Sequence, residues 1–181
     1  MTEKKELRRQ IKAAKAAVPL EEKLRRSQGI MSQVAELKPF ADAEVVLLYW
    51  SMDDEVQTHR FVEEQYRAGK TVLLPCVDGD DLVLRQYTGL EQMKAGEQFG
   101  IGEPTGAIFD DLGKVGAIVV PGVAFDRQGH RMGRGRGFYD RLLASTPNAY
   151  KIGVAFDFQM VPQVPVEPHD KMMDVVVTES N

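Results

Sequence analysis

Residues 117–125 read AIVVPGVAF, an apolar run whose β-branched start predicts a buried strand that leads into a loop. The segment 126–135 that follows is rich in glycine and charge, and a helix is expected from about residue 137 to residue 143. YKIGVAF, at residues 150–156, predicts the next strand. A strand, a loop, a helix and a second strand in this order are typical of an α/β fold with parallel strands.

The same alternation extends in both directions from this unit. Amphipathic spacing predicts two N-terminal helices, the first ending near Pro19 and the second at Pro39. A short helix is expected around residues 90–94, inside the otherwise irregular segment 89–110. Further strands are expected at EVVLLYW (44–50), TVLLPCV (71–77), LVLRQY (82–87) and DVVVTES (174–180), with a helix at 58–68.

We therefore predict an α/β fold, a single three-layer domain over residues 1–181 with a mostly parallel, Rossmann-like sheet. Ligands of such sheets bind at the carboxyl ends of the strands. Candidate ligand-binding loops are therefore those after Trp50, after Phe125 and after Phe156.

Composition narrows the range of functions. Lys and Arg number 23 against 27 Asp and Glu, and the net charge of −4 argues against a general nucleic-acid coat. Cys76 is the single cysteine, so an intrachain disulfide and a four-cysteine zinc site are excluded, and its apolar surroundings predict a buried thiol. No stretch approaches the roughly 20 apolar residues that cross a bilayer. We expect a cytoplasmic protein without membrane or nucleic-acid partners, and a monomer is favoured although the sequence does not determine the oligomeric state.

Five residues between a predicted strand and a predicted helix alternate glycine with arginine. This glycine loop, residues 133–137, has the sequence Gly-Arg-Gly-Arg-Gly. Glycines allow close backbone approach to a ligand, the helix that follows directs its N-terminal N–H groups to the same place, and arginines bind phosphate oxygens. It lacks the Gly-Lys-Ser/Thr of a Walker A loop and the glycine spacing of a dinucleotide fingerprint. A polyanion site is favoured over a flexible surface loop or an Arg-Gly patch for RNA.

The longer string GVAFDRQGHRMGRGRGFYDR, residues 122–141, resembles the signature of the 5-formyltetrahydrofolate cyclo-ligase family, usually GxAFDxxGxRLGxGxGYYDR. Three other segments are similar to that family. They are the N-terminal Lys4-Lys5-Glu6-Leu7-Arg8, the loop Trp50–Val56 on the folate side, and a C-terminal segment with Val164-Pro165, His169-Asp170 and Asp174.

The resemblance implies conversion of 5-formyltetrahydrofolate and ATP to 5,10-methenyltetrahydrofolate, ADP and phosphate, with Mg²⁺ as cofactor. Arg134 and Arg136 are the implied catalytic residues, and Asp140 and Asp174 the implied Mg²⁺ ligands. Folate contacts are implied for Trp50, Glu55 and the run Arg134, Gly135, Arg136, Gly137 and Phe138. ATP contacts are implied for Lys4, Lys5, Glu6, Leu7, Arg8, Arg131, Met132, Gly133, Arg134, Gly135, Arg136, Gly137, Phe138 and Tyr139.

Three positions depart from the usual family pattern. Phe138 replaces a tyrosine and removes its hydroxyl, Arg136 keeps or adds positive charge, and Trp50 replaces an aliphatic residue beside the expected pterin pocket. Simpler interpretations of single residues also stay open. From spacing alone, Lys4 and Arg8 fit a solvated helix face, Glu55 a polar turn, Asp174 a strand edge or cap, and His169 a structural histidine.

Two other classes of function remain as alternatives. An RNA-binding module would need a basic face with regularly spaced exposed aromatics, and the sequence has neither. An ATP-independent sugar-phosphate isomerase or CoA-transferase-like enzyme would keep the α/β fold and the glycine loop. Dependence on ATP discriminates between these enzymes and a cyclo-ligase.

Overall fold

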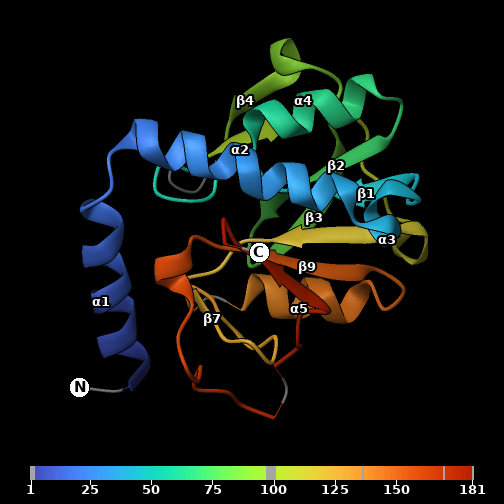
Figure 1. Ribbon diagram of the computed structural model, residues 1–181. Coiled ribbons are helices and arrows are strands. Elements are labelled where there is room, and N and C mark those ends of the chain that lie inside the picture. Colours follow the sequence, from blue (N-terminus) through green and yellow to red (C-terminus); the bar gives the residue numbers. More distant parts are fainter. Residues whose placement is uncertain (1–2, 97–100, 136, 169, 181) are drawn as a thin grey trace.

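A six-stranded sheet forms the centre of the computed structural model, which describes residues 3–96, 101–135, 137–168 and 170–180 (Figure 1). Its strand order is β10-β9-β6-β1-β2-β3. All neighbouring strands pair in parallel except β2 and β3, so the prediction of a mostly parallel sheet is confirmed. The strands are β1 (Val45–Leu47), β2 (Thr71–Asp78), β3 (Asp81–Gln86), β6 (Ala117–Val120), β9 (Tyr150–Val154) and β10 (Val175–Val177).

Helices cover both faces of this sheet. In Figure 1, α2 (Leu20–Glu36), α3 (Lys38–Ala41) and α4 (His59–Arg67) lie on one side and α5 (Phe138–Ser145) on the other. Successive strand residues point to opposite faces. Val46 and Leu48 accordingly pack in a core cluster with α2 and α4, whereas Leu47 packs in a second cluster with residues of α5. The predicted three-layer arrangement is confirmed.

The first helix, α1 (Glu3–Ala16), lies outside these layers, beside the β7–β8 region (Figure 1). Ile11 packs in a small apolar cluster with Ala124, Met132 and Val164. This contact fixes α1 against the segment that carries the glycine loop. Within the described residues, no helix is both long enough and apolar enough to cross a membrane.

Two segments differ from the predicted elements. The run AIVVPGVAF is not one strand, because β6 ends at Val120 and β7 (Ala124–Phe125) pairs with β8 (Arg131–Met132) in a separate antiparallel pair. In place of a helix around residues 90–94 there is a single 3-10 turn, Leu90–Gln92, followed by a hairpin of β4 (Met93–Ala95) and β5 (Gly102–Pro104). Pairing of β4 with β5, whose partner residues are 7 to 11 positions apart, outweighs the local helical preference there. The remaining 3-10 turns are η2 (Leu112–Lys114) and η3 (Asp157–Gln159).

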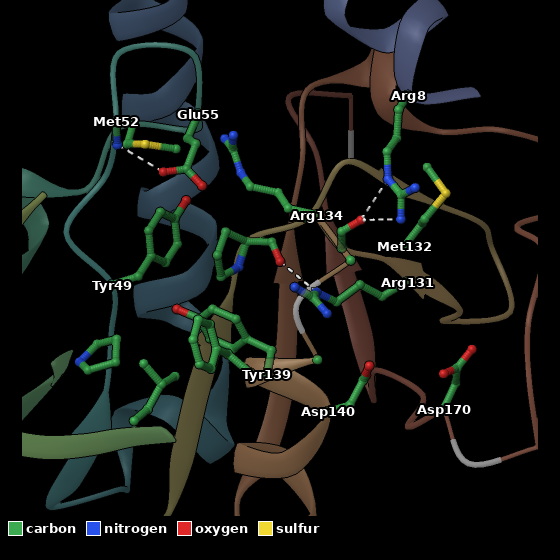
Figure 2. Close-up of a pocket in the computed structure, with 18 of the residues that line it drawn as sticks. Arg8, Tyr49, Met52, Glu55, Arg131, Met132, Arg134, Tyr139, Asp140 and Asp170 are labelled. Carbon is green, nitrogen blue, oxygen red and sulfur yellow. Dashed lines mark hydrogen bonds between the residues drawn. The ribbon is translucent and has the colours of Figure 1, made fainter. Parts of the chain in front are cut away.

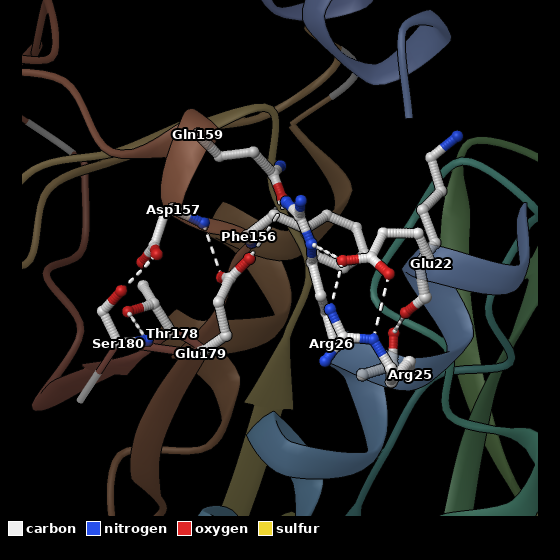
Figure 3. A network of polar contacts seen from close by, with 11 residues as sticks. Glu22, Arg25, Arg26, Phe156, Asp157, Gln159, Thr178, Glu179 and Ser180 are labelled. Carbon is white, nitrogen blue, oxygen red and sulfur yellow. Dashed lines mark hydrogen bonds and ion pairs between the residues drawn. The ribbon is translucent and has the colours of Figure 1, made fainter. Parts of the chain in front are cut away.

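A polar network ties the C-terminal end of the chain to α2 and η3 (Figure 3). Arg26 pairs with Glu22 at 3.0 Å and with Glu179 at 3.4 Å, and Glu179 accepts a hydrogen bond from the Asp157 N–H at 2.6 Å. The Gln159 amide in the same turn donates to the carbonyl oxygen of Gly122 at 2.8 Å. Gly122 lines the large cavity of the molecule, so this network contacts the cavity wall.

Candidate active site

A cavity of about 470 Å³ lies at the carboxyl ends of β1, β2 and β6. Figure 2 shows residues from α1, the loop after β1, the β7–β8 region and α5 converging on it. Its position agrees with the rule that ligands bind beyond the carboxyl ends of parallel strands. The loops after Trp50, Phe125 and Phe156, which the sequence indicated, all contribute lining residues.

One wall of the cavity is cationic and contains much of the glycine loop. Arg8 donates from Nε and Nη2 to the carbonyl oxygen of Gly133, each at 3.3 Å, so α1 is joined directly to this loop. Arg134 is exposed and pairs with Asp54 at 3.5 Å. Lys4, at the start of α1, pairs with Glu167 at 3.2 Å. These cations, together with the loop, form a surface suited to an anion.

Arg131 provides a further cation deep in this wall. Its Nε donates to the carbonyl oxygen of Pro121 at 2.6 Å, and its guanidinium lies 5.0 Å from the centre of the Tyr139 ring. Burial lowers the pKa of Arg131 from its usual value, while Tyr139 and Asp140 act in the opposite direction. An arginine nevertheless stays charged in proteins. Arg131 is therefore a fixed positive charge that lines the cavity.

The glycine loop uses backbone conformations that side chains rarely adopt. Gly135 has φ +101° and Gly137 has φ +73°. Gly137 is also the N-cap of α5, so the first N–H groups of that helix face the end of the loop. The requirement for glycine at these two positions is therefore conformational.

Another part of the cavity is mainly apolar, and the cavity also contains a partly buried acid, Glu55. Tyr49, Pro75, Val77 and Leu82 are among its walls. The Met52 N–H donates to Glu55 Oε1 at 2.8 Å. Burial raises the pKa of Glu55 above its ordinary value of 4.5, and the Met52 hydrogen bond and the nearby Arg134 partly counteract this shift. The site thus combines an apolar slot, hydrogen-bonding carboxyl groups and a cationic wall.

The two predicted metal ligands lie in different places. Asp140, in the first turn of α5, lines the cavity, and so does Asp170 (Figure 2). Asp174 does not line it, because its carboxylate accepts a hydrogen bond from the Lys151 N–H at 2.8 Å, where β10 begins to pair with β9. Its position fits the strand-edge role that spacing alone allowed. No cluster of three or more metal-ligating side chains occurs in the described part of the chain.

The predicted site residues divide into three groups. Among those that the structure places on the cavity are Lys4, Arg8, Glu55, Arg131, Met132, Gly133, Arg134, Gly135, Gly137, Phe138, Tyr139 and Asp140. Lys5, Glu6, Leu7 and Trp50 do not line it, and Trp50 instead stacks on His59 at 3.8 Å between ring centres. Arg136 and His169 lie outside the described residues.

Tyr49, Asp170 and Glu103 are among the lining residues that were not predicted as site residues. Tyr49 precedes the predicted loop directly, and its hydroxyl donates to the carbonyl oxygen of Val56 at 2.7 Å. Asp170 belongs to the C-terminal segment that resembles the family and lines the cavity, whereas the resemblance implied Asp174 as the metal ligand. Glu103 sits in the hairpin that the sequence presented as irregular, so no local signal marked it.

The fold and the cavity together define an α/β protein in which one cavity has a cationic wall beside an apolar part. The sequence pattern of the 5-formyltetrahydrofolate cyclo-ligase family matches residues 1–179. The chain belongs to this family, and it is an enzyme of the cyclo-ligase class.

Individual relatives support this assignment. The 5-formyltetrahydrofolate cyclo-ligase of Escherichia coli K12 is 32% identical over 179 residues, covering 94% of this chain and 97% of that protein. The mouse enzyme of the same name is 28% identical, covering 98% and 94% respectively. The Aquifex aeolicus 5,10-methenyltetrahydrofolate synthetase structure matches with a TM-score of 0.88 and 35% identity, covering 99% of this chain and 91% of that one. These matches give no support to an ATP-independent isomerase or transferase.

Proposed function

We propose that this enzyme converts 5-formyltetrahydrofolate to 5,10-methenyltetrahydrofolate, with ATP as co-substrate and ADP and phosphate as the other products. The observation that supports this most is that one cavity joins an apolar slot containing Glu55 to a wall formed by Arg8, Arg134 and the glycine loop. A pterin ring fits the first part and a triphosphate fits the second. The reaction needs both groups in contact, and a shared cavity provides that.

The chemistry explains why a phosphate site must adjoin a folate site. A formamide carbon is a poor electrophile, because its nitrogen donates electrons into the carbonyl group. Transfer of the γ-phosphoryl group to the formyl oxygen turns that oxygen into a leaving group. N10 then attacks the formyl carbon within the same molecule, loses its proton, and the C–O bond breaks to release phosphate. Proximity accelerates such an intramolecular closure strongly.

The cationic wall is assigned to the transferring phosphoryl group. Arg134 exchanges its 3.5 Å pair with Asp54 for phosphate oxygens, and Arg8 and Lys4 approach the nucleotide from α1. Arg136 is assigned to the same task from sequence. Loop N–H groups and arginines stabilise the charge that spreads over the equatorial oxygens in the transition state.

The folate ring is assigned to the apolar part. Glu55 accepts hydrogen bonds from ring N–H groups, with its geometry set by the Met52 N–H. Phe138, which lacks the tyrosine hydroxyl usual in the family, still lines the cavity as an apolar wall, and the Arg141 guanidinium lies 5.3 Å from its ring centre. Trp50 is assigned a supporting role, because the stack on His59 keeps it behind the cavity wall.

The donor set also fits Mg²⁺. Asp140 and Asp170 both line the cavity, and Mg²⁺ is commonly held by one or two carboxylates together with nucleotide phosphates and water. We assign the ion to these two residues rather than to Asp174. When bound, Mg²⁺ neutralises charge on the phosphates.

The proposal also takes the chain to be a single-domain, cytoplasmic monomer. Its one cysteine, Cys76, is free and buried, in keeping with a reducing compartment.

The test is direct observation of the product. Purified protein is mixed with 5-formyltetrahydrofolate, ATP and Mg²⁺, and the near-ultraviolet absorption band of the methenyl product is followed. We expect the band to grow only when both ATP and Mg²⁺ are present. Growth without ATP would contradict the cyclo-ligase proposal, and undiminished growth after chelation would contradict its metal part.

A further inference from the structure

Glu103 is a buried carboxylate without an evident purpose in the reaction as described above. It lies on β5, lines the cavity and is 7% exposed. Charged side chains are rarely so buried unless they are paired. Within the described residues Glu103 forms no ion pair, and its one hydrogen bond comes from the Val77 N–H, which donates to Oε2 at 2.8 Å.

The hairpin holds this carboxylate in a fixed place. A Cβ atom added at Gly96 would lie 2.8 Å from Cδ and 2.9 Å from Cγ of Glu103, so the absence of a side chain at Gly96 makes the space that Glu103 fills. The Gly96 N–H donates to the carbonyl oxygen of Ile101 at 2.8 Å and closes the hairpin around it. The Val77 N–H fixes the far end of the side chain. A rigid carboxylate is suited to recognition.

The second oxygen of this carboxylate is open to the cavity. Oε1 has no hydrogen-bond partner in the described chain. Every fully buried side-chain oxygen or nitrogen in the described residues does have a partner, so Oε1 is not fully buried. Oε1 must therefore reach accessible space, and the cavity is the space that Glu103 lines. Near it the cavity walls are Val77, Leu82 and Ile101, which offer no competing polar side chain.

We infer that Glu103 binds N–H groups of the pterin ring and is a second residue that determines folate specificity. Like Glu55, it uses one oxygen for a backbone N–H and keeps the other for a ligand. The two acids belong to separate parts of the chain, the loop after β1 and the β4–β5 hairpin. They can therefore accept hydrogen bonds from two different edges of one ring. Phosphate is excluded as its ligand, because a carboxylate repels an anion. This inference rests on the proposed function.

The variant Glu103→Gln separates ligand binding from structural support. Glutamine has one amide oxygen, and if that oxygen stays on the Val77 N–H, its NH₂ group faces the ring donors in place of an acceptor. We expect KM for 5-formyltetrahydrofolate to rise about tenfold or more, as for loss of a charge-assisted hydrogen bond, while KM for ATP changes less than about twofold. Glu103→Asp keeps the charge but is shorter, so its KM should be intermediate. Glu91→Gln, at an exposed glutamate that does not line the cavity, is the matched control and should leave both constants unchanged.

A tetrahydropterin that carries the 5-formyl group but lacks the aminobenzoylglutamate tail localises the contact. We expect its inhibition constant to rise in Glu103→Gln by the same factor as KM. An unchanged KM for folate in a folded variant would overturn the inference. A rise in KM for ATP alone would also overturn it, because that result would place the nucleotide base at Glu103. Thermal unfolding establishes that the variant is folded. Equilibrium binding of 5-formyltetrahydrofolate to the wild-type protein tests the inference even if no turnover is seen. If the wild-type protein shows neither binding nor turnover, both the inference and the proposed function are overturned.

Discussion

Replacing Glu55 by glutamine should separate folate binding from ATP binding. The Met52 N–H donates to Glu55 Oε1 at 2.8 Å, and the amide oxygen of glutamine can accept the same bond. What is lost is the second carboxylate oxygen, which the proposal assigns to ring N–H groups. Loss of one charge-assisted hydrogen bond costs about 1.5–3 kcal/mol, which corresponds to about 10- to 150-fold in affinity for 5-formyltetrahydrofolate. ATP affinity should change less than about twofold.

The raised pKa of Glu55 adds a dependence on pH. Burial favours the protonated carboxyl in the folded protein, so its pKa lies above the ordinary value of 4.5. Ionised Glu55 therefore destabilises the fold at neutral pH, and this destabilisation disappears as the pH falls through the raised folded pKa. Glu55→Gln should be at least as stable as wild type at pH 7, and lose that advantage in acid. Wild-type folate affinity should fall over the same acid window, whereas the variant should show no such fall.

The assay is isothermal titration of each ligand into wild type and variant, with thermal unfolding measured across pH. The carboxylate Glu91, exposed and away from the cavity, provides the control variant Glu91→Gln. An equal loss of affinity for ATP and for folate would refute the assignment of Glu55 to the pterin. The assignment would also be refuted if the folate affinity of Glu55→Gln still fell in acid as it does in wild type.

Three further predictions concern the anionic part of the site. Gly135→Val should raise KM for ATP about tenfold or more while costing about 1–2 kcal/mol of stability, because φ is +101° there; unchanged ATP affinity in a folded variant would place the phosphates elsewhere. Asp140→Asn should raise the Mg²⁺ concentration for half-maximal rate about tenfold or more and Asp174→Asn should not, since only Asp140 lines the cavity; the reverse order would return the metal to Asp174. Arg8→Met keeps the apolar stem but removes both bonds to Gly133, so KM for ATP should rise with KM for folate unchanged; an effect on folate alone would contradict the placement of α1.

Local patterns were sufficient to predict the sheet but not its details. Runs such as EVVLLYW and AIVVPGVAF identified buried strands, because a strand covered on both faces must be apolar throughout. The antiparallel direction of β3 follows from a two-residue turn that joins it to β2. The separate β7–β8 pair consists of two strands of two residues each, and strands this short leave no periodic signal.

The candidate site shows the same division. The glycine loop was predictable, because its residue types and its place after a strand are local properties, whereas Glu55 was indicated by the family resemblance. Asp174 and Asp170 are four residues apart, and only the pairing of β10 with β9 turns the first toward Lys151 while the second reaches the cavity. Trp50 was expected on the folate but stacks on His59, and Glu103 lies in a hairpin within a segment that showed no strand pattern.

The central claim is that the formyl oxygen accepts the γ-phosphoryl group directly. It is tested by labelling the formyl oxygen of 5-formyltetrahydrofolate with ¹⁸O and running a single turnover with ATP and Mg²⁺. The account predicts that the label appears in inorganic phosphate, as detected by mass spectrometry, because the oxygen leaves with the phosphoryl group when N10 closes the ring. Label found only in water would mean that ATP hydrolysis drives the closure indirectly, and would contradict the role assigned to Arg134 and the glycine loop.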